Sequence, residues 1–417
     1  MNVGNGKRKP PTDSPDFLLP PYGPRVEVPL WDPGPRLRRP WEALGGLLSR
    51  RGSPGELEAG VRSLTGAGRV ASYSSGGAAL TAGLMASRLP RRGEVIIPSY
   101  ICGRVADAVI SAGLRLCLVD VGEDGLISTG AVEEAVGDSS CAIIAPHLYG
   151  KLCDMPALSE IATDNGLILV DDSAQAIGAS SGSRMAGSMG DFGIISFGPG
   201  KVSSGIGGGC LLTDSEEIFR ALPEPLPPPG ILGEMRQING LLVERRLRKA
   251  AAPYRHLKKP SPRNLLPPDR PPRRVAVEGM GLIQSRACLA SLNDIGDDLG
   301  ARRLMAAWLR EELHGIDATL PGEIEGRAWR GYPVLLSGKH RYEVAVELAG
   351  SRVETIPPYV PIHMQGRYRE YYRISGNLQV SEDSFRRLVI LPLHRGMGQA
   401  ELELVAGSLR RAVGPGI

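Results

Sequence analysis

The chain has 417 residues, of which 42% are hydrophobic and 23% charged, the balance of a globular protein with two or three domains and a large core. No run approaches the roughly 18 to 20 apolar residues of a membrane span, and the N-terminus lacks the apolar segment of a secretory signal. Six scattered cysteines without zinc-site spacing argue against disulfides and bound metal, and indicate a cytoplasmic protein.

The N-terminal part is predicted as an arm followed by helices. Residues 1–27 are rich in Pro, Lys and Arg and poor in apolar residues, which is typical of a flexible tail. Helical patterns follow at Trp41–Leu48 and Pro54–Leu64. Ser53 suits the N-cap of the second helix, because Pro54 then takes its first position.

Between residues 70 and 214 short apolar runs alternate with helix-compatible segments. The runs are Val70–Tyr73, Glu94–Pro98, Leu114–Val121, Ser140–Ala145, Leu167–Val170, Gly193–Phe197 and Gly209–Thr213. Strands that are apolar on both faces predict a mainly parallel, seven-stranded sheet sandwiched by helices, an α/β fold. Ligands of such sheets bind at the carboxyl ends of the strands.

The net charge of +4 is unevenly distributed. Residues 221–274 hold 12 Lys and Arg against 4 Asp and Glu, a local charge of +8, so the remainder carries −4. The same segment holds 12 of the 35 prolines. We therefore divide the chain into the arm, a large domain at 28–220, a basic insert at 221–274, and a helical linker with a smaller C-terminal α+β domain at 275–417.

Three groups of residues directly after predicted strands carry the chemistry. Ser74–Leu80 opens a helix with small residues, which exposes backbone N–H groups to an anion. Asp171 and Asp172 end a buried strand, where one can cap a helix and the other can hold a cation. Lys201 follows the next strand. A phosphate cup, a carboxylate and an amine at one sheet edge are what pyridoxal phosphate requires.

Several motifs in order make the chain resemble the DegT/DnrJ/StrS family of fold-type-I pyridoxal-phosphate enzymes, mostly aminotransferases of nucleotide-linked keto-sugars. The stretches are SSGGAAL, GEVIIPSY, PHLYGKLCDM, VDDSAQAIGA, GDFGIISFGPGK, PIHMQGRY and LPLH. The resemblance implies that Lys201 bonds to the cofactor in a Schiff base and moves the proton, and that Asp172 pairs with the pyridine nitrogen. It further implies that the cofactor also contacts Gln175, Gly77, Ala78 and Ser196.

The chain departs from the family at two cofactor positions. Cys102 stands where the family stacks an aromatic residue on the cofactor ring, so a smaller group or Tyr100 would cover it. Residues 277–279 replace the family's Asn-Tyr-Arg stretch, whose Asn reaches the partner subunit's phosphate. The resemblance still implies a homodimer with active sites at the subunit interface.

Four further residues are candidate substrate contacts. His147 and Tyr149 lie in the HLYG stretch, and His363 lies in PIHMQGRY. Arg104 stands where the family has a small residue, so it would bind an anionic substrate or be a solvated helix residue. His363 has either a substrate contact or a structural role.

The basic insert has two interpretations. Gly230–Leu247 has apolar residues at helical spacing and then a run of Arg and Lys, which suits an amphipathic helix packed at a dimer contact and followed by a solvated loop. Alternatively the charge forms a surface for an acidic carrier, a nucleotide-linked substrate or a membrane. No nucleic-acid-binding fold accompanies the charge.

The sequence therefore predicts an enzyme that moves an amino group from a donor such as glutamate to a keto-sugar in sugar or natural-product biosynthesis. One alternative is a pyridoxal-phosphate enzyme with a non-sugar substrate or different chemistry. Another is a cofactor-binding regulator or pseudoenzyme, against which the presence of Lys201, Asp172 and Gln175 argues.

Overall fold

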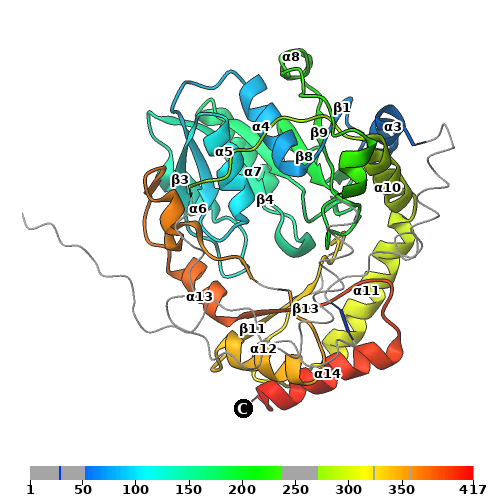
Figure 1. Ribbon diagram of the computed structural model, residues 1–417. Helices are drawn as coiled ribbons and strands as arrows, with labels where there is room; N and C mark the ends of the chain where they lie inside the picture. Colours follow the sequence, from blue (N-terminus) through cyan, green and yellow to red (C-terminus); the bar gives the residue numbers. More distant parts are fainter. Residues whose placement is uncertain (1–27, 30–51, 237–270, 323–324, 357, 417) are drawn as a thin grey trace, which may run out of the picture.

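A computed structural model describes residues 28–29, 52–236, 271–322, 325–356 and 358–416 (Figure 1). The predicted arm, the helix at 41–48 and residues 237–270 of the basic insert lie outside these ranges. The helix predicted to begin at 230 is described over residues 231–236. No helix in the described part of the chain is both long and apolar enough to cross a bilayer.

The large sheet contains the seven predicted strands and one more. Their order is β1-β9-β8-β5-β4-β2-β3-β12, and all are parallel except β9, which pairs antiparallel with both neighbours. The bounds are β1 Arg69–Tyr73, β2 Glu94–Pro98, β3 Arg115–Val119, β4 Ser140–Pro146, β5 Ile168–Asp172, β8 Phe192–Ser196, β9 Gly209–Thr213 and β12 Tyr372–Ile374. The α/β architecture is confirmed. Strand β12 was not predicted, because three residues carry no period of their own.

Helices cover both faces of this sheet, as strands with apolar residues on both sides require. In β2, Ile96 faces one core, whereas Val95 and Ile97 face the other. One face is covered by α4 Gly76–Ala86, α5 Gly103–Ser111 and α8 Glu216–Arg220. The opposite face is covered by α3 Pro54–Thr65, α6 Thr129–Ala135, α7 Met155–Asp164 and α10 Leu282–Asn293.

A smaller antiparallel sheet, β10-β11-β13, lies beneath the large one in Figure 1. It packs with helices around a third apolar core that includes Leu309, Val344 and Leu409. The elements are α11 Ile295–Glu312, β10 Ala318–Thr319, β11 Tyr332–Leu336, α12 Arg341–Gly350, α13 Gln379–Arg387, β13 Leu388–Leu391 and α14 Gln399–Val413. The remaining elements are β6 Ser180–Ser181, β7 Arg184–Met185, and the 3-10 helices η2 Leu148–Gly150, η4 Ile362–Met364 and η5 Gly366–Tyr368.

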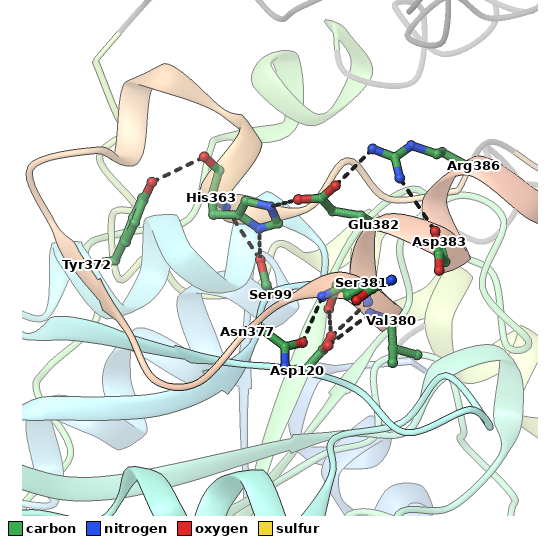
Figure 2. Close-up of polar contacts among 11 residues, drawn as sticks. Ser99, Asp120, His363, Tyr372, Asn377, Val380, Ser381, Glu382, Asp383 and Arg386 are labelled. Atoms are coloured by element: carbon green, nitrogen blue, oxygen red, sulfur yellow. Dashed lines mark hydrogen bonds and ion pairs between the residues drawn. The ribbon is translucent and has the colours of Figure 1, made fainter. Parts of the chain in front are cut away.

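A buried carboxylate joins the large sheet to helix α13 (Figure 2). Asp120 follows β3 and is 8% exposed. Its Oδ1 accepts hydrogen bonds from the Ser381 N–H (2.7 Å) and Oγ (2.6 Å), and its Oδ2 accepts one from the Val380 N–H (2.9 Å). The first turn of α13 has no cap from its own N-cap residue, Leu378. Asp120 therefore supplies the missing acceptors from a distant part of the chain.

We expect Asp120→Ala to lower the free energy of unfolding by about 2–4 kcal/mol, because buried donors at the start of α13 lose their acceptors. Urea unfolding followed by circular dichroism measures the change. Glu123→Ala, an exposed carboxylate three residues along, is the matched control and should change stability by less than about 0.5 kcal/mol. Equal effects of the two substitutions would contradict the capping role.

Candidate active site

The predicted phosphate cup is built at the start of α4. Ser75 is the N-cap, and its Oγ accepts the Ala78 N–H at 3.1 Å. A Cβ added to Gly76 would lie 2.9 Å from Ser196 Cβ and 3.2 Å from its Oγ. The Ser196 hydroxyl therefore stands beside the first turn, where backbone N–H groups lack intrahelical acceptors. Because the Ala78 amide is engaged by Ser75, Gly77 is the freer of the two predicted backbone donors.

The glycine run before β9 is explained by this cup. Gly207 and Gly208 have φ of 127° and 102°, which a larger residue rarely adopts. A Cβ on Gly209 would lie 2.4 Å from the Gly76 backbone nitrogen. Only glycine lets β9 approach the start of α4 this closely. Gln284 fastens the same place, because its Nε2 donates to the Ser74 carbonyl at 3.0 Å.

Asp171 is saturated by donors. It accepts hydrogen bonds from Ser173 Oγ (2.6 Å), the Gly187 N–H (2.8 Å) and the Met189 N–H (3.0 Å), and its Oδ1 lies 3.0 Å from His147 Nε2. Burial alone would raise its pKa, but the facing imidazole and the hydrogen bonds hold the pKa of Asp171 below its usual value. Asp171 therefore holds together the loops below the sheet edge.

Asp172 lies in a different environment, because alternate strand residues point to opposite faces. Within the described chain its side chain accepts one hydrogen bond, from the Ala174 N–H at 3.1 Å. Burial raises the pKa of Asp172, although Ala174 and the charge of Lys201 oppose the rise. A buried carboxylate with so few donors is stabilised by an added cation. The two adjacent carboxylates thus differ in their hydrogen bonding, and the one that the resemblance pairs with the pyridine nitrogen is the one with fewer donors.

Lys201 lies beyond the adjoining strand β8, on a tight turn. Its N–H donates to the Gly198 carbonyl at 3.2 Å, and Gly200 has a φ of 77°. Burial and the positive charge of Arg330 lower the pKa of Lys201 to about 8, although Cys102 and Asp172 act in the opposite direction. An amine with this pKa is partly neutral near pH 7, as a nucleophile or base requires.

Gln175 is held by two tyrosines. Its Oε1 accepts the Tyr149 N–H at 3.4 Å, and its Nε2 donates to the Tyr359 hydroxyl at 3.0 Å. Tyr149 has a left-handed φ of 54°, and its hydroxyl lies 2.8 Å from that of Tyr100. The Tyr100 ring meets Tyr359 edge to face. Tyr100 is fully buried in these contacts.

Three other predicted residues, Cys102, Arg104 and His147, differ in their burial and contacts. Cys102 is half-buried at the N-cap of α5, without a capping hydrogen bond, and interacts electrostatically with Lys201. Arg104 is exposed in the first turn of α5. His147 is 1% exposed, and its Nδ1 accepts the Cys153 N–H at 3.0 Å. Since both nitrogens of that ring face protein groups, the geometry favours support of Asp171 over substrate contact.

The His363 ring lies between Ser99 and Glu382 (Figure 2). Its Nδ1 lies 2.7 Å from Ser99 Oγ, and its Nε2 lies 3.3 Å from Glu382 Oε1. Burial lowers the pKa of His363, although Glu382 opposes this. Of the two roles left open by the sequence, these contacts favour the structural one.

The stretch that replaces the family's Asn-Tyr-Arg contributes backbone instead of side chains. The Glu278 carbonyl accepts the Ser74 N–H at 2.8 Å, and the Val277 carbonyl accepts the Leu226 N–H at 2.8 Å. The segment thereby joins the phosphate cup to the first part of the basic insert.

Two residues near Lys201 were missed. Tyr359 precedes the PIHMQGRY stretch by two residues, and Arg330 precedes β11 by two residues. Both act electrostatically on the same group of side chains. Neither stands directly after a predicted sheet strand, so the rule that found Asp172 and Lys201 gave no signal for them.

Comparisons with known proteins agree on one family. The profile of the DegT/DnrJ/EryC1/StrS aminotransferase family matches residues 46–225 and 279–410, well over half of the chain. A UDP-N-acetyl-3-dehydro-alpha-D-glucosamine 3-aminotransferase from Acidithiobacillus ferrooxidans is 28% identical, covering 86% of this chain and 88% of that protein. A dTDP-3-amino-3,6-dideoxy-alpha-D-galactopyranose transaminase from Aneurinibacillus thermoaerophilus is 27% identical, covering 89% and 91%.

The fold also matches a solved structure. The crystal structure of DesV from S. venezuelae, in complex with a ketimine intermediate, superposes with a TM-score of 0.72. It is 24% identical and covers 93% of this chain and 98% of that one.

We expect Lys201 in the cofactor-free protein to react with an amine-modifying reagent half-maximally near pH 8, since only the neutral amine is nucleophilic. Asp172→Asn should move the midpoint to lower pH, because Asp172 raises the pKa of Lys201. Peptide mass spectrometry across a pH series measures both. Lys151, paired with Asp124 on the surface, is the internal control; an equal shift there would contradict a local effect.

Proposed function

Since this chain belongs to the DegT/DnrJ/EryC1/StrS aminotransferase family, we propose that it transfers an amino group from an amino-acid donor to the ketone of a nucleotide-linked sugar. The observation that carries the proposal is the pairing of a low-pKa lysine with an under-bonded buried carboxylate at one sheet edge. Relatives that align over most of the chain are named for amino groups on UDP- and dTDP-linked sugars, which supports the substrate class. Glutamate or glutamine is the proposed donor.

The residues present fit pyridoxal 5'-phosphate, the cofactor of this family. Gly77 and Ser196 offer a backbone and a hydroxyl donor for a phosphate. Asp172 offers a carboxylate that has one hydrogen bond and no cation of its own within ion-pair distance among the described residues. Lys201 offers an amine.

When bound, the cofactor supplies a carbonyl that takes up the amino group and a ring that accepts electrons from the reacting carbon. Asp172 would keep a ring nitrogen protonated, because its carboxylate is stabilised by that positive charge. Lys201, with its pKa near 8, would take a proton at Nζ from the donor carbon that carries the nitrogen and return it to the cofactor carbon on the other side of that nitrogen. Gln175 would donate to the ring oxygen through Nε2, with Tyr359 fixing its orientation.

We further propose a cytoplasmic homodimer. An apolar patch lies beside the phosphate cup, and its side chains are 37–75% exposed: Leu226, Ile231, Leu232, Met235 and Leu282. Glu234 holds the patch rigid, because its carboxylate accepts the Gln284 N–H at 2.9 Å. Exposed large apolar side chains in neighbouring segments suit a protein interface. A partner subunit there would cover residues 231–236, the described start of the helix predicted in the basic insert.

We expect purified protein supplied with cofactor to turn yellow, and borohydride to fix the cofactor to the peptide containing Lys201. Lys201→Ala should lower the single-turnover rate by at least about a thousandfold, since it removes the proton-transferring group.

Conversion of the amino-loaded enzyme by a panel of nucleotide-linked keto-sugars, followed by absorbance, tests the substrate class. Turnover with non-sugar ketones alone would favour the alternative of a non-sugar substrate, and a protein that takes up no cofactor would overturn the proposal.

We expect Leu232→Asp to shift the protein from dimer to monomer at micromolar concentration. Burying an unpaired carboxylate in the contact would cost more free energy than the remaining apolar contact contributes. Sedimentation velocity measures the change. Leu304→Asp, at a side chain that is 75% exposed on α11 outside the patch, is the matched control. A dimer that survives Leu232→Asp would place the interface elsewhere.

A further inference from the structure

Arg330 is a half-buried cation without an anion. Its Nε is fully buried and has no hydrogen-bond partner. No carboxylate of the described residues lies within ion-pair distance of its guanidinium. A guanidinium left this way is costly unless a ligand completes it.

The two arginines nearest in the fold have partners of their own. Arg302 pairs with Asp298 at 2.6 Å and donates to the Trp329 carbonyl at 3.2 Å. Arg327 lies over the Trp329 ring at 4.0 Å. The lack of a partner is therefore particular to Arg330 among these three, and the backbone that carries it is pinned by Arg302.

The segment before Arg330 is packed against the active site. The Ala328 N–H donates to the Gly150 carbonyl at 3.1 Å, and a Cβ on Gly150 would lie 2.6 Å from the Trp329 nitrogen. The same turn presents the Tyr149 N–H to Gln175. Arg330, two residues before β11 of the small sheet, consequently lies next to the group of active-site residues that includes Gln175 and Lys201.

The charge of Arg330 acts on two residues of that group, Lys201 and Tyr359. It contributes to the lowered pKa of Lys201 and opposes the raised pKa of Tyr359, both of which are shifted mainly by burial. An anion that binds Arg330 would therefore sit within electrostatic reach of the lysine amine.

We propose that Arg330 binds the α-carboxylate of the amino-acid donor. The inference rests on the proposed aminotransferase function, because every α-amino-acid donor carries its carboxylate on the same carbon as the reacting nitrogen. A nucleotide-linked keto-sugar carries its phosphates beyond the anomeric carbon, further from the reacting ketone. A planar guanidinium matches a carboxylate through two parallel hydrogen bonds.

The two half-reactions of the holoenzyme separate donor from acceptor. We expect Arg330→Met to lower the single-turnover efficiency with glutamate by about a hundredfold, mainly through a weaker apparent affinity. Without the Arg330 charge the pKa of Lys201 rises, and this affects every amine and the keto-sugar half-reaction alike. The rate with 4-aminobutyrate, which is glutamate without the α-carboxylate, and the rate of the keto-sugar half-reaction should therefore fall only by one small, common factor. Arg330→Lys keeps a positive charge, so its loss should be smaller than that of Arg330→Met. The control variant Arg91→Met, at an exposed arginine, should keep the wild-type rates.

A binding measurement tests the same contact without turnover. 2-Methylglutamate keeps the α-carboxylate but has no α-proton to lose, so its affinity for the holoenzyme can be titrated spectroscopically. Arg330→Met should weaken it about a hundredfold relative to wild type, with cofactor content and circular dichroism matching the Arg91→Met control.

Several results would overturn the assignment. An equal loss with glutamate and 4-aminobutyrate would make Arg330 structural, and so would loss of cofactor in both Arg330→Met and Arg330→Lys. A loss confined to the keto half-reaction would place the carboxylate on the acceptor. If no amine converts the wild-type enzyme, the proposed function fails, whereas unchanged 2-methylglutamate affinity in the variant overturns the Arg330 assignment alone.

Discussion

The active-site geometry depends on two opposite charges brought together at the carboxyl edge of a parallel sheet. Asp172 ends β5, and Lys201 follows β8, the strand paired in parallel with β5 in the register Asp172↔Ile194. Each residue alone is unfavourable in a buried place, and each shifts the pKa of the other toward its charged form. Burial and the charge of Arg330 outweigh this effect on Lys201 and leave the amine partly neutral, while the Asp172 carboxylate accepts one hydrogen bond within the described chain. The two groups are therefore set up for chemistry and do not form a satisfied ion pair.

The surrounding structure determines which groups lie near Asp172 and Lys201. Asp171, one residue earlier, accepts the hydrogen bonds of the loop amides at 187 and 189 and lies 3.0 Å from His147 Nε2, so none of these donors is bonded to Asp172. The glycine run before β9 lets α4 approach the sheet, which brings the cup to the same edge. Tyr359 and Arg330 lie in connections next to the small sheet. The candidate site is thus assembled from the carboxyl ends of two strands, the start of one helix and two connecting segments.

The rule that ligands bind after parallel strands predicted Asp172, Lys201 and the cup residues as candidates, because each directly follows or ends a strand that the alternation revealed. The rule reached no further. Tyr359 and Arg330 lie in connections whose positions are set by packing against residues far away in the chain. His363 stands in a recognisable stretch, but its direction is decided by Ser99 and Glu382, both distant in sequence. The apolar residues of the helix that begins at residue 231 were visible in the sequence as a pattern. The hydrogen bond from the Gln284 N–H to the Glu234 carboxylate, which fixes that helix to α10, was not.

The sequence by itself determined the α/β class, the seven strands and the family resemblance, because period and position along the chain are local properties. Only the tertiary structure decided how many donors each of the two adjacent carboxylates meets, in which direction burial shifts the pKa of Lys201, and that the buried Nε of Arg330 has no hydrogen-bond partner. These depend on burial and on hydrogen-bond partners from distant segments, and both quantities arise only when the chain is packed.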